Sequence, residues 1–359
     1  MTGDEGRSEG RSHSVADMTA TPEARASEQS DAVGYLAVLL ATACWGSSGI
    51  WVEFVVEASG ISALALAFWR DLTTFLVLFL GLRLLQPAWL QIKRCDLKWL
   101  IALGASLGIF HVFWNLGVLL NGAAVATVQQ AAMPAIVAIV AALIWSEPLH
   151  VRKILAIILT FIGTVLVSGL DVLGQADLSW GGFLVGLGIP VSYAGWNVFG
   201  KRVRGDYNPV TTLTYGFGFG ALVLLPFQAF TPQPWPVPAE TFLWFAGLIS
   251  VATISAFSLY TFALGRLQAS VASILAMAEI PIVAVYAYVL LGEHMSLDQV
   301  IGAALVIAGV LMLSARRSHP GRRSHPGRHG PRAQDDGVGS DGGATGGATR
   351  DEKAERTKE

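Results

Sequence analysis

Charged residues are scarce in this sequence, where they occupy 14% of the 359 positions. Soluble proteins carry charge at about a quarter of their positions, whereas hydrophobic residues reach 53% here. A soluble globular protein is therefore excluded, and the composition indicates an integral membrane protein. The formal net charge is −2, and we expect no nucleic-acid partner.

Cysteine is scarce as well, with Cys44 inside a hydrophobic run and Cys95 in a basic loop. The two positions are badly placed for a disulfide, and they lack the spacing of metal ligands. We therefore predict no redox chemistry, no metal site and no cofactor. Residues 1–31 lack the apolar core of a signal peptide and mix Asp, Glu and Arg, which predicts a disordered tail.

Ten hydrophobic runs are long enough to cross a bilayer as helices, since about 20 residues at a rise of about 1.5 Å span about 30 Å. The runs lack the alternation of barrel strands, so the predicted fold is an all-α integral membrane bundle of ten transmembrane helices. The predicted spans are 33–54, 62–82, 97–119, 123–145, 151–170, 180–200, 209–229, 241–263, 269–291 and 297–314.

The sequence also repeats with an offset of 146 positions, which aligns the segment from Ala123 with the segment from Ala269. Each copy has an apolar run with an internal proline, a terminal Glu and a second apolar run with a central Gly. Because each half holds five spans, an odd number, we predict two inverted five-helix repeats at 33–170 and 180–314. The matches with most weight are Glu147 with Glu293 and Gly163 with Gly309, while Pro134 and Pro281 lie one register apart.

Lys and Arg occur in alternate loops. They follow spans two, four, six, eight and ten, whereas the other loops contain neither residue. Basic loops stay on the cytoplasmic side, so both termini are predicted to be cytoplasmic, in a bacterial plasma (inner) membrane. The motif RRSHPG at 316–321 recurs at 322–327, and residues 315–359 are predicted to form a disordered basic and polar tail, with metal binding as the alternative.

Several motifs along this pattern resemble a known family. They are Trp-Gly-Ser in span one (Trp45, Gly46, Ser47), Phe-x-Arg in span two (Phe68, Arg70), and proline-containing apolar segments that end at Glu147 and Glu293. Over about residues 33–315 the chain resembles the drug/metabolite transporter superfamily, specifically its EamA-type members. Span nine departs from the family's Glu-Pro pattern, because Ile280 separates Glu279 from Pro281.

The resemblance implies a permease, most often an exporter of amino acids, amines or other small metabolites, driven by a proton or substrate gradient. We therefore predict a secondary transporter of a small polar metabolite that works by alternating access and is not an enzyme. A membrane-embedded enzyme is the alternative, although no nucleophile–base pair emerges and the loops are short. A sensor or scaffold without transport is a further alternative, and the oligomeric state stays open.

Polar residues inside spans are costly in lipid and are therefore the candidate site residues. Spans three and six each carry an aromatic and amide stripe at positions i, i+3 and i+4, which suits a cavity for a polar or cationic ligand or, alternatively, helix packing. Arg70 is the sole Lys or Arg in a span interior, and it either contacts the substrate or ties helices together. The predicted substrate-binding residues are Trp45, Ser48, Arg70, His111, Trp114, Asn115, Gln130, Tyr193, Trp196, Asn197 and Tyr260.

Glu279 is a lone carboxyl in the apolar run of span nine. Its ionised form is expensive in the middle of a bilayer, so we predict that Glu279 exchanges protons and couples transport to them. The alternative is a protonated hydrogen-bonding partner. Glu147 and Glu293 end their spans, where water is close, and are predicted to serve interfacial structure, with gating as the alternative.

Overall fold

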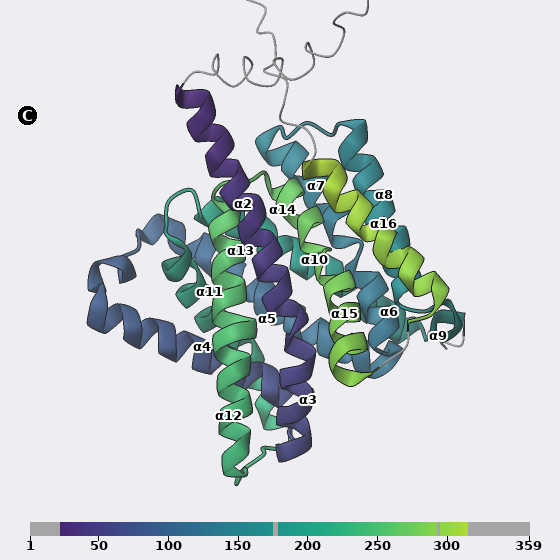
Figure 1. The fold of residues 1–359 in the computed structure, drawn as a ribbon. Coiled ribbons are helices and arrows are strands. Elements are labelled where there is room, and N and C mark those ends of the chain that lie inside the picture. The colour runs from purple at the N-terminus through teal and green to yellow at the C-terminus, as the bar shows by residue number, and fades with distance from the viewer. Residues whose placement is uncertain (1–21, 175–178, 293–294, 315–359) are drawn as a thin grey trace, which may run out of the picture. The chain divides into compact units, whose positions relative to one another are not determined.

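The computed structural model describes residues 22–174, 179–292 and 295–314, and in this part of the chain the regular structure is helical (Figure 1). Helix α2 begins at Pro22, inside the segment for which the sequence predicts a tail. The rest of that segment, the C-terminal tail from 315 and Glu293 lie outside the described residues.

The first half contains five helical spans. Span one consists of α2 and α3, and span four of α6 and α7, while single helices form the other three. The bounds are α2 Pro22–Gly46, α3 Ser48–Ser59, α4 Ala63–Leu85, α5 Leu97–Asn121, α6 Ala123–Gln130, α7 Met133–Trp145 and α8 Val151–Val167. Short connecting elements are η1 Pro87–Leu90, η2 Arg94–Asp96 and α9 Leu170–Gly174.

The second half repeats this arrangement. Span eight runs through a π-helical segment, η4, and span nine consists of α14 and α15. The bounds are α10 Trp180–Val203, α11 Pro209–Leu224, η3 Leu225–Ala229, α12 Ala239–Gly247, η4 Leu248–Ser255, α13 Ala256–Leu264, α14 Ala269–Ala276, α15 Glu279–Leu291 and α16 Leu297–Ser314.

The described helices confirm the predicted fold class of ten helices in two five-helix repeats. Eight are long and apolar enough to cross a membrane. The apolar helix Leu297–Leu313 is shorter, and α8 has 17 residues.

Polar side chains fix where several helices begin. The hydroxyl of Ser62 accepts the N–H of Ala65 at the start of α4, and Ser179 does the same for Gly182 at the start of α10. Asn208 caps α11, whose first residue is a proline. Such caps satisfy N–H groups that a helix leaves unpaired at its first turn, which explains why short hydrophilic breaks suffice between spans.

Helices from opposite halves pack closely where glycines face each other. A Cβ atom on Gly163 of α8 would lie 2.6 Å from the carbonyl oxygen of Gly302 on α16. Likewise, a Cβ atom on Gly108 of α5 would lie 2.7 Å from the carbonyl oxygen of Gly220 on α11. Larger side chains would separate these backbones, as is common at helix contacts within membranes. The two halves therefore share one core.

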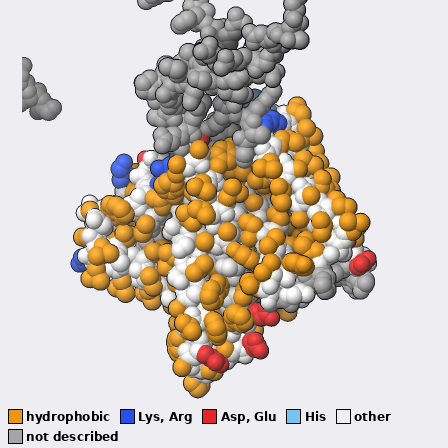
Figure 2. All heavy atoms as spheres, viewed as in Figure 1, with side chains coloured by type: hydrophobic (Ala, Val, Ile, Leu, Met, Phe, Trp, Pro, Cys, Tyr) orange, Lys and Arg blue, Asp and Glu red, His pale blue; other side chains and the backbone are white. Residues whose placement is uncertain are grey.

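The surface of the bundle is hydrophobic. Figure 2 shows orange hydrophobic side chains over most of the visible face, with Lys and Arg toward its upper end and Asp and Glu toward its lower end. Large side chains such as Leu84, Leu143 and Trp180 are exposed on the helices. An apolar belt between two polar ends fits the hydrocarbon of a bilayer, so the chain is a multi-pass membrane protein.

Candidate functional site

Spans four and nine are both broken near their middle. The α6 helix ends at Gln130 and α7 begins at Met133, while α14 ends at Ala276 and α15 begins at Glu279. A proline follows each break, Pro134 in one half and Pro281 in the other, and proline both lacks an N–H and clashes with the carbonyl four residues earlier. The turns at 131–132 and 277–278 differ by the repeat offset of 146, so the breaks are equivalent although the prolines are shifted by one residue.

A cavity of about 620 Å³ lies between the two halves, beside these breaks. Ala63, Ala123, Ser168 and Met295 of its lining adjoin the loops after spans one, three, five and nine, so the cavity extends toward that end of the bundle. Its volume lies in the range of sites for small molecules.

Most of the predicted site residues line this cavity, although they come from spans far apart in the sequence. They bring together aromatic rings, amides, a guanidinium and a carboxyl. The predicted residues in the lining are Trp45, Ser48, Arg70, His111, Trp114, Asn115, Gln130, Tyr193 and Glu279.

Trp196, Asn197 and Tyr260 lie behind the cavity wall instead. Trp196 is 2% exposed, and its ring packs between those of Tyr193 and Tyr260, at centroid distances of 5.8 and 5.4 Å. The hydroxyl of Tyr260 donates to the side-chain oxygen of Asn197, which is itself fully buried. Because Tyr193 and Trp45 occupy the space in front of them, these three residues support the wall rather than contact the cavity.

Arg70 and Asp71 are joined both through His111 and by a direct ion pair, in which Arg70 Nε lies 3.8 Å from Asp71 Oδ1. The Nη2 atom of Arg70 lies 2.7 Å from Nε2 of His111, and Nδ1 of His111 lies 3.0 Å from Oδ2 of the buried Asp71. Arginine can only donate, so Nε2 accepts the hydrogen bond. The proton of the imidazole is then on Nδ1, from which it is donated to the carboxylate. His111 is thus neutral in this arrangement, and it holds the guanidinium at the cavity.

Glu279 is the first residue of α15 and lines the cavity together with Arg70. The N-terminal end of a helix carries partial positive charge, which favours an acidic residue there. The same cavity therefore presents a cationic and an acidic side chain, with the amide of Asn115 nearby. Asn115 also donates to the carbonyl oxygen of His111 at 2.6 Å, which ties its position to that of the Arg70 contact.

The cavity also has lining residues that the sequence analysis missed, among them Thr127, Ser168 and Gln299. Thr127 precedes Gln130 by three positions, a spacing that places both on one face of α6 and could have identified it. The neighbouring Gln129 instead accepts a hydrogen bond from Asn121 at 3.3 Å. Ser168 and Gln299 lie at span ends, where polar residues are common and carry no signal.

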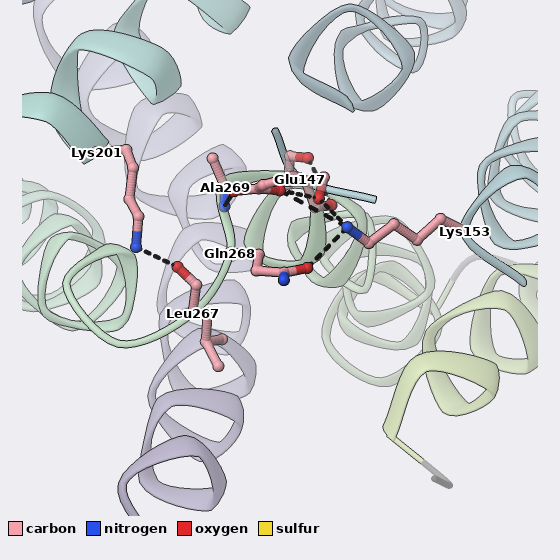
Figure 3. A network of polar contacts seen from close by, with 8 residues as sticks. Glu147, Lys153, Lys201, Leu267, Gln268 and Ala269 are labelled. Carbon is pink, nitrogen blue, oxygen red and sulfur yellow. Dashed lines mark hydrogen bonds and ion pairs between the residues drawn. The ribbon is translucent and has the colours of Figure 1, made fainter. Parts of the chain in front are cut away.

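At the opposite end of the bundle, Glu147 caps a helix of the other half (Figure 3). Its Oε1 atom accepts the N–H of Ala269, the first residue of α14, at 2.9 Å. Its Oε2 atom accepts the N–H of Ser270 at 3.3 Å and also the hydroxyl of Ser270. Glu147 lies at the end of its span, but it is only 8% exposed because the start of α14 covers it.

Two lysines complete this contact. The Nζ atom of Lys153 lies 3.7 Å from Oε2 of Glu147 and donates to Gln268 at 2.7 Å and to Ser270 at 2.8 Å. Lys201, on α10, donates to the carbonyl oxygen of Leu267. Figure 3 shows both side chains directed toward the segment that precedes α14. We call Glu147, Lys153, Gln268, Ala269 and Ser270 the Glu147 clamp, since they hold the two halves together at this end.

Comparisons with known proteins agree with this architecture. The model of the EamA-like transporter family matches residues 32–169 and 180–315. An uncharacterised inner membrane transporter of Salmonella typhimurium, YicL, is 27% identical over 290 residues, which cover 78% of this chain and 95% of the relative. An uncharacterised transporter of Archaeoglobus fulgidus is 28% identical and is matched over 99% of its length, against 79% of this chain.

The fold also matches an experimental structure. A crystal structure superposes with a TM-score of 0.65 over 80% of this chain and 97% of the other chain. Its sequence identity is 18%, so the likeness concerns the fold alone.

Proposed function

Because the chain belongs to the EamA-like transporter family and is a membrane transporter, we propose that it exports a small polar metabolite, such as an amino acid or an amine, by alternating access. The observation that carries this proposal is the cavity between the two halves. It extends toward one end of the bundle, while the Glu147 clamp holds the halves together at the other. A transporter needs this asymmetry, with its site accessible from one side at a time.

The lining supports the proposed class of substrate. Arg70 carries N–H donors that pair well with a carboxylate, and His111 engages one of its nitrogens. Glu279 is an acceptor for an ammonium group, and the ring of Trp45 suits a cation or an apolar side chain. A molecule that bears both an amine and a carboxylate, or an amine alone, matches these groups.

We assign the clamp end to the cytoplasm of a plasma (inner) membrane, with both termini on that side. Lys153, Lys201 and Arg266 belong to that end, and basic residues accumulate on the cytoplasmic side. Ser59→Cys should then react with an impermeant thiol reagent added to intact cells, whereas Cys95 should react only after the membrane is broken. Labelling of Cys95 in intact cells would reverse the orientation.

The function itself is tested by transport in vesicles. Purified protein is reconstituted, and the release of radiolabelled amino acids and amines is compared with that from empty vesicles. We expect at least one compound of this class to move, and Arg70→Gln to slow its movement. Arg83→Gln, at an exposed position after span two, is the matched control and should transport normally. If folded protein moves none of these compounds, the proposed substrate class is wrong.

A further inference from the structure

A second cavity, of about 960 Å³, lies at the clamp end, where Lys153 and Gln268 of the clamp form part of its lining. Its walls come from α2, the start of α8, the loop before α14 and the end of α16. Two contacts hold these walls together: Arg152 donates to the carbonyl oxygen of Met312, and the Tyr35 hydroxyl donates to that of Leu313 at 3.4 Å. We call this space the basal cavity.

The lining of the basal cavity is rich in basic side chains. Arg152 and Arg266 contribute two cations, and His150 adds an imidazole. Lys153 also belongs to the lining, but its charge is paired with Glu147 at 3.7 Å. In the described lining, Asp31 is the carboxylate that faces them. The guanidinium of Arg266 lies 3.6 Å from the ring centroid of Phe262, which fixes it at the rim without neutralising it. An excess of fixed positive charge in a confined space attracts an anion.

The backbone at the start of α8 adds donors to the same wall. His150 is the N-cap of this helix, and its side chain makes no capping hydrogen bond. The first N–H groups of a helix are unpaired within it and bind phosphate groups readily, and those of α8 begin beside Arg152. The backbone donors beside Arg152 therefore favour a phosphate group over a carboxylate as the bound anion.

The cavity is apolar along the side that faces the bilayer. Val151 and Leu155 belong to its lining and are exposed on α8. Ile158 and Ile162 are exposed too, and the spacing 151, 155, 158 and 162 places all four side chains on one face of the helix. The basic cavity thus continues into a hydrophobic stripe of helix surface.

We propose that the basal cavity binds the phosphate headgroup of an anionic phospholipid, whose acyl chain lies along the exposed stripe of α8. The cations and the α8 N-terminus hold the phosphate, and the stripe distinguishes a lipid from a soluble phosphate. The site is separate from the cavity proposed for transport, so its occupation is measured without any transport assay.

The test is a binding titration on delipidated, detergent-purified full-length protein. The melting temperature of the protein is measured at each lipid concentration and reports binding. Short-chain phosphatidylglycerol should raise the melting temperature saturably, and short-chain phosphatidylcholine should not. The double variant Arg152→Gln/Arg266→Gln should weaken phosphatidylglycerol binding about 30-fold, because each basic residue near a lipid surface contributes about a fivefold effect. Arg83→Gln/Arg94→Gln removes two exposed arginines outside the cavity and should leave binding unchanged.

Three outcomes would overturn the proposal. They are unchanged binding in the Arg152→Gln/Arg266→Gln variant, equal stabilisation by phosphatidylcholine, and equal stabilisation by inorganic phosphate or glycerol 3-phosphate, which would make the ligand a soluble anion. If the double variant does not fold, His150→Glu replaces it. His150 is exposed, so this variant should fold, and its added negative charge should weaken phosphatidylglycerol binding about fivefold, whereas His150→Gln should not.

Discussion

Arg70 donates a hydrogen bond of 2.7 Å to His111, which lies 41 positions further along the chain. The imidazole in turn donates to the buried carboxylate of Asp71 at 3.0 Å. Asp71 thus holds Arg70 in two ways, through a histidine of another span and through a direct ion pair of 3.8 Å between Arg70 Nε and Asp71 Oδ1. Nε of Arg70 is buried without a hydrogen-bond partner among the described residues, so the donors left for the cavity belong to the terminal nitrogens of the guanidinium.

His111→Leu should therefore raise the KM for transport and lower stability. It removes the acceptor of Arg70 and leaves the Asp71 carboxylate without its donor, and a buried unpaired polar group costs about 1–3 kcal/mol. His111→Gln should retain more of both properties, since its amide can accept from Arg70 and donate to Asp71. Transport kinetics and the melting temperature check this. If the His111→Leu and His111→Gln variants have the same KM and melting temperature, the hydrogen bonds of His111 affect neither transport nor stability.

Glu279→Gln should separate exchange from accumulation. Glutamine keeps the shape and the hydrogen-bonding capacity of a protonated acid but cannot titrate. The variant should insert normally and exchange substrate across vesicles at equal pH, yet fail to accumulate it when a pH difference is imposed. Wild-type protein in the same vesicles is the control. Full accumulation driven by pH in the variant would show that Glu279 is structural.

Asn115→Ala and Trp196→Ala should fail in different ways. Asn115 lines the cavity, so its loss should weaken transport while most of the protein stays folded. Trp196 is buried among four other rings, and truncation of a buried aromatic side chain costs about 3–5 kcal/mol. Its loss should lower the amount of folded protein, measured by size-exclusion chromatography of membrane extracts. If the Trp196→Ala protein is folded but inactive, Trp196 contributes to substrate binding, as the sequence predicted.

Glu147→Ala should open the clamp end. In a background without Cys95, a cysteine at the buried Ser273 reports access to α14 from that side. Without the Glu147 carboxylate, the N–H groups of Ala269 and Ser270 lose their acceptor, so Ser273→Cys should react at least about tenfold faster with a thiol reagent, which corresponds to about 1.4 kcal/mol. Glu57→Ala, in an exposed region of α3, is the control. Equal reaction rates would show that the clamp does not close this end.

Hydrophobic runs and the distribution of Lys and Arg were sufficient to predict ten helices in two repeats. They could not predict that α2 begins at Pro22, because a helix that extends beyond the hydrocarbon needs no apolar residues. The π-helical segment Leu248–Ser255 was not predicted either. It contains neither a proline nor a glycine, and its geometry arises from packing rather than from a local sequence signal.

The candidate site was predictable only in part, because local spacing does not show which residues of other helices pack nearby. Spacing at i, i+3 and i+4 correctly grouped Tyr193 with Trp196 on one side of α10, but it gives no information on which part of that side a neighbouring ring covers. Glu147 illustrates a second limit. It accepts a hydrogen bond from Ala269, which is 122 positions away. The sequence around Glu147 cannot predict that a helix of the other half begins next to it.

Opening of the Glu147 clamp also changes the number of water molecules bound to the protein. Glu147 and Lys153 are buried and hydrogen-bonded in the closed arrangement, and charged groups that lose such partners must be solvated instead. Separation of the halves at this end therefore draws water molecules into the crevice. The opening step should consequently take up water, which is released again on closure, and osmolytes too large to enter the crevice should slow transport by favouring the dehydrated, closed form.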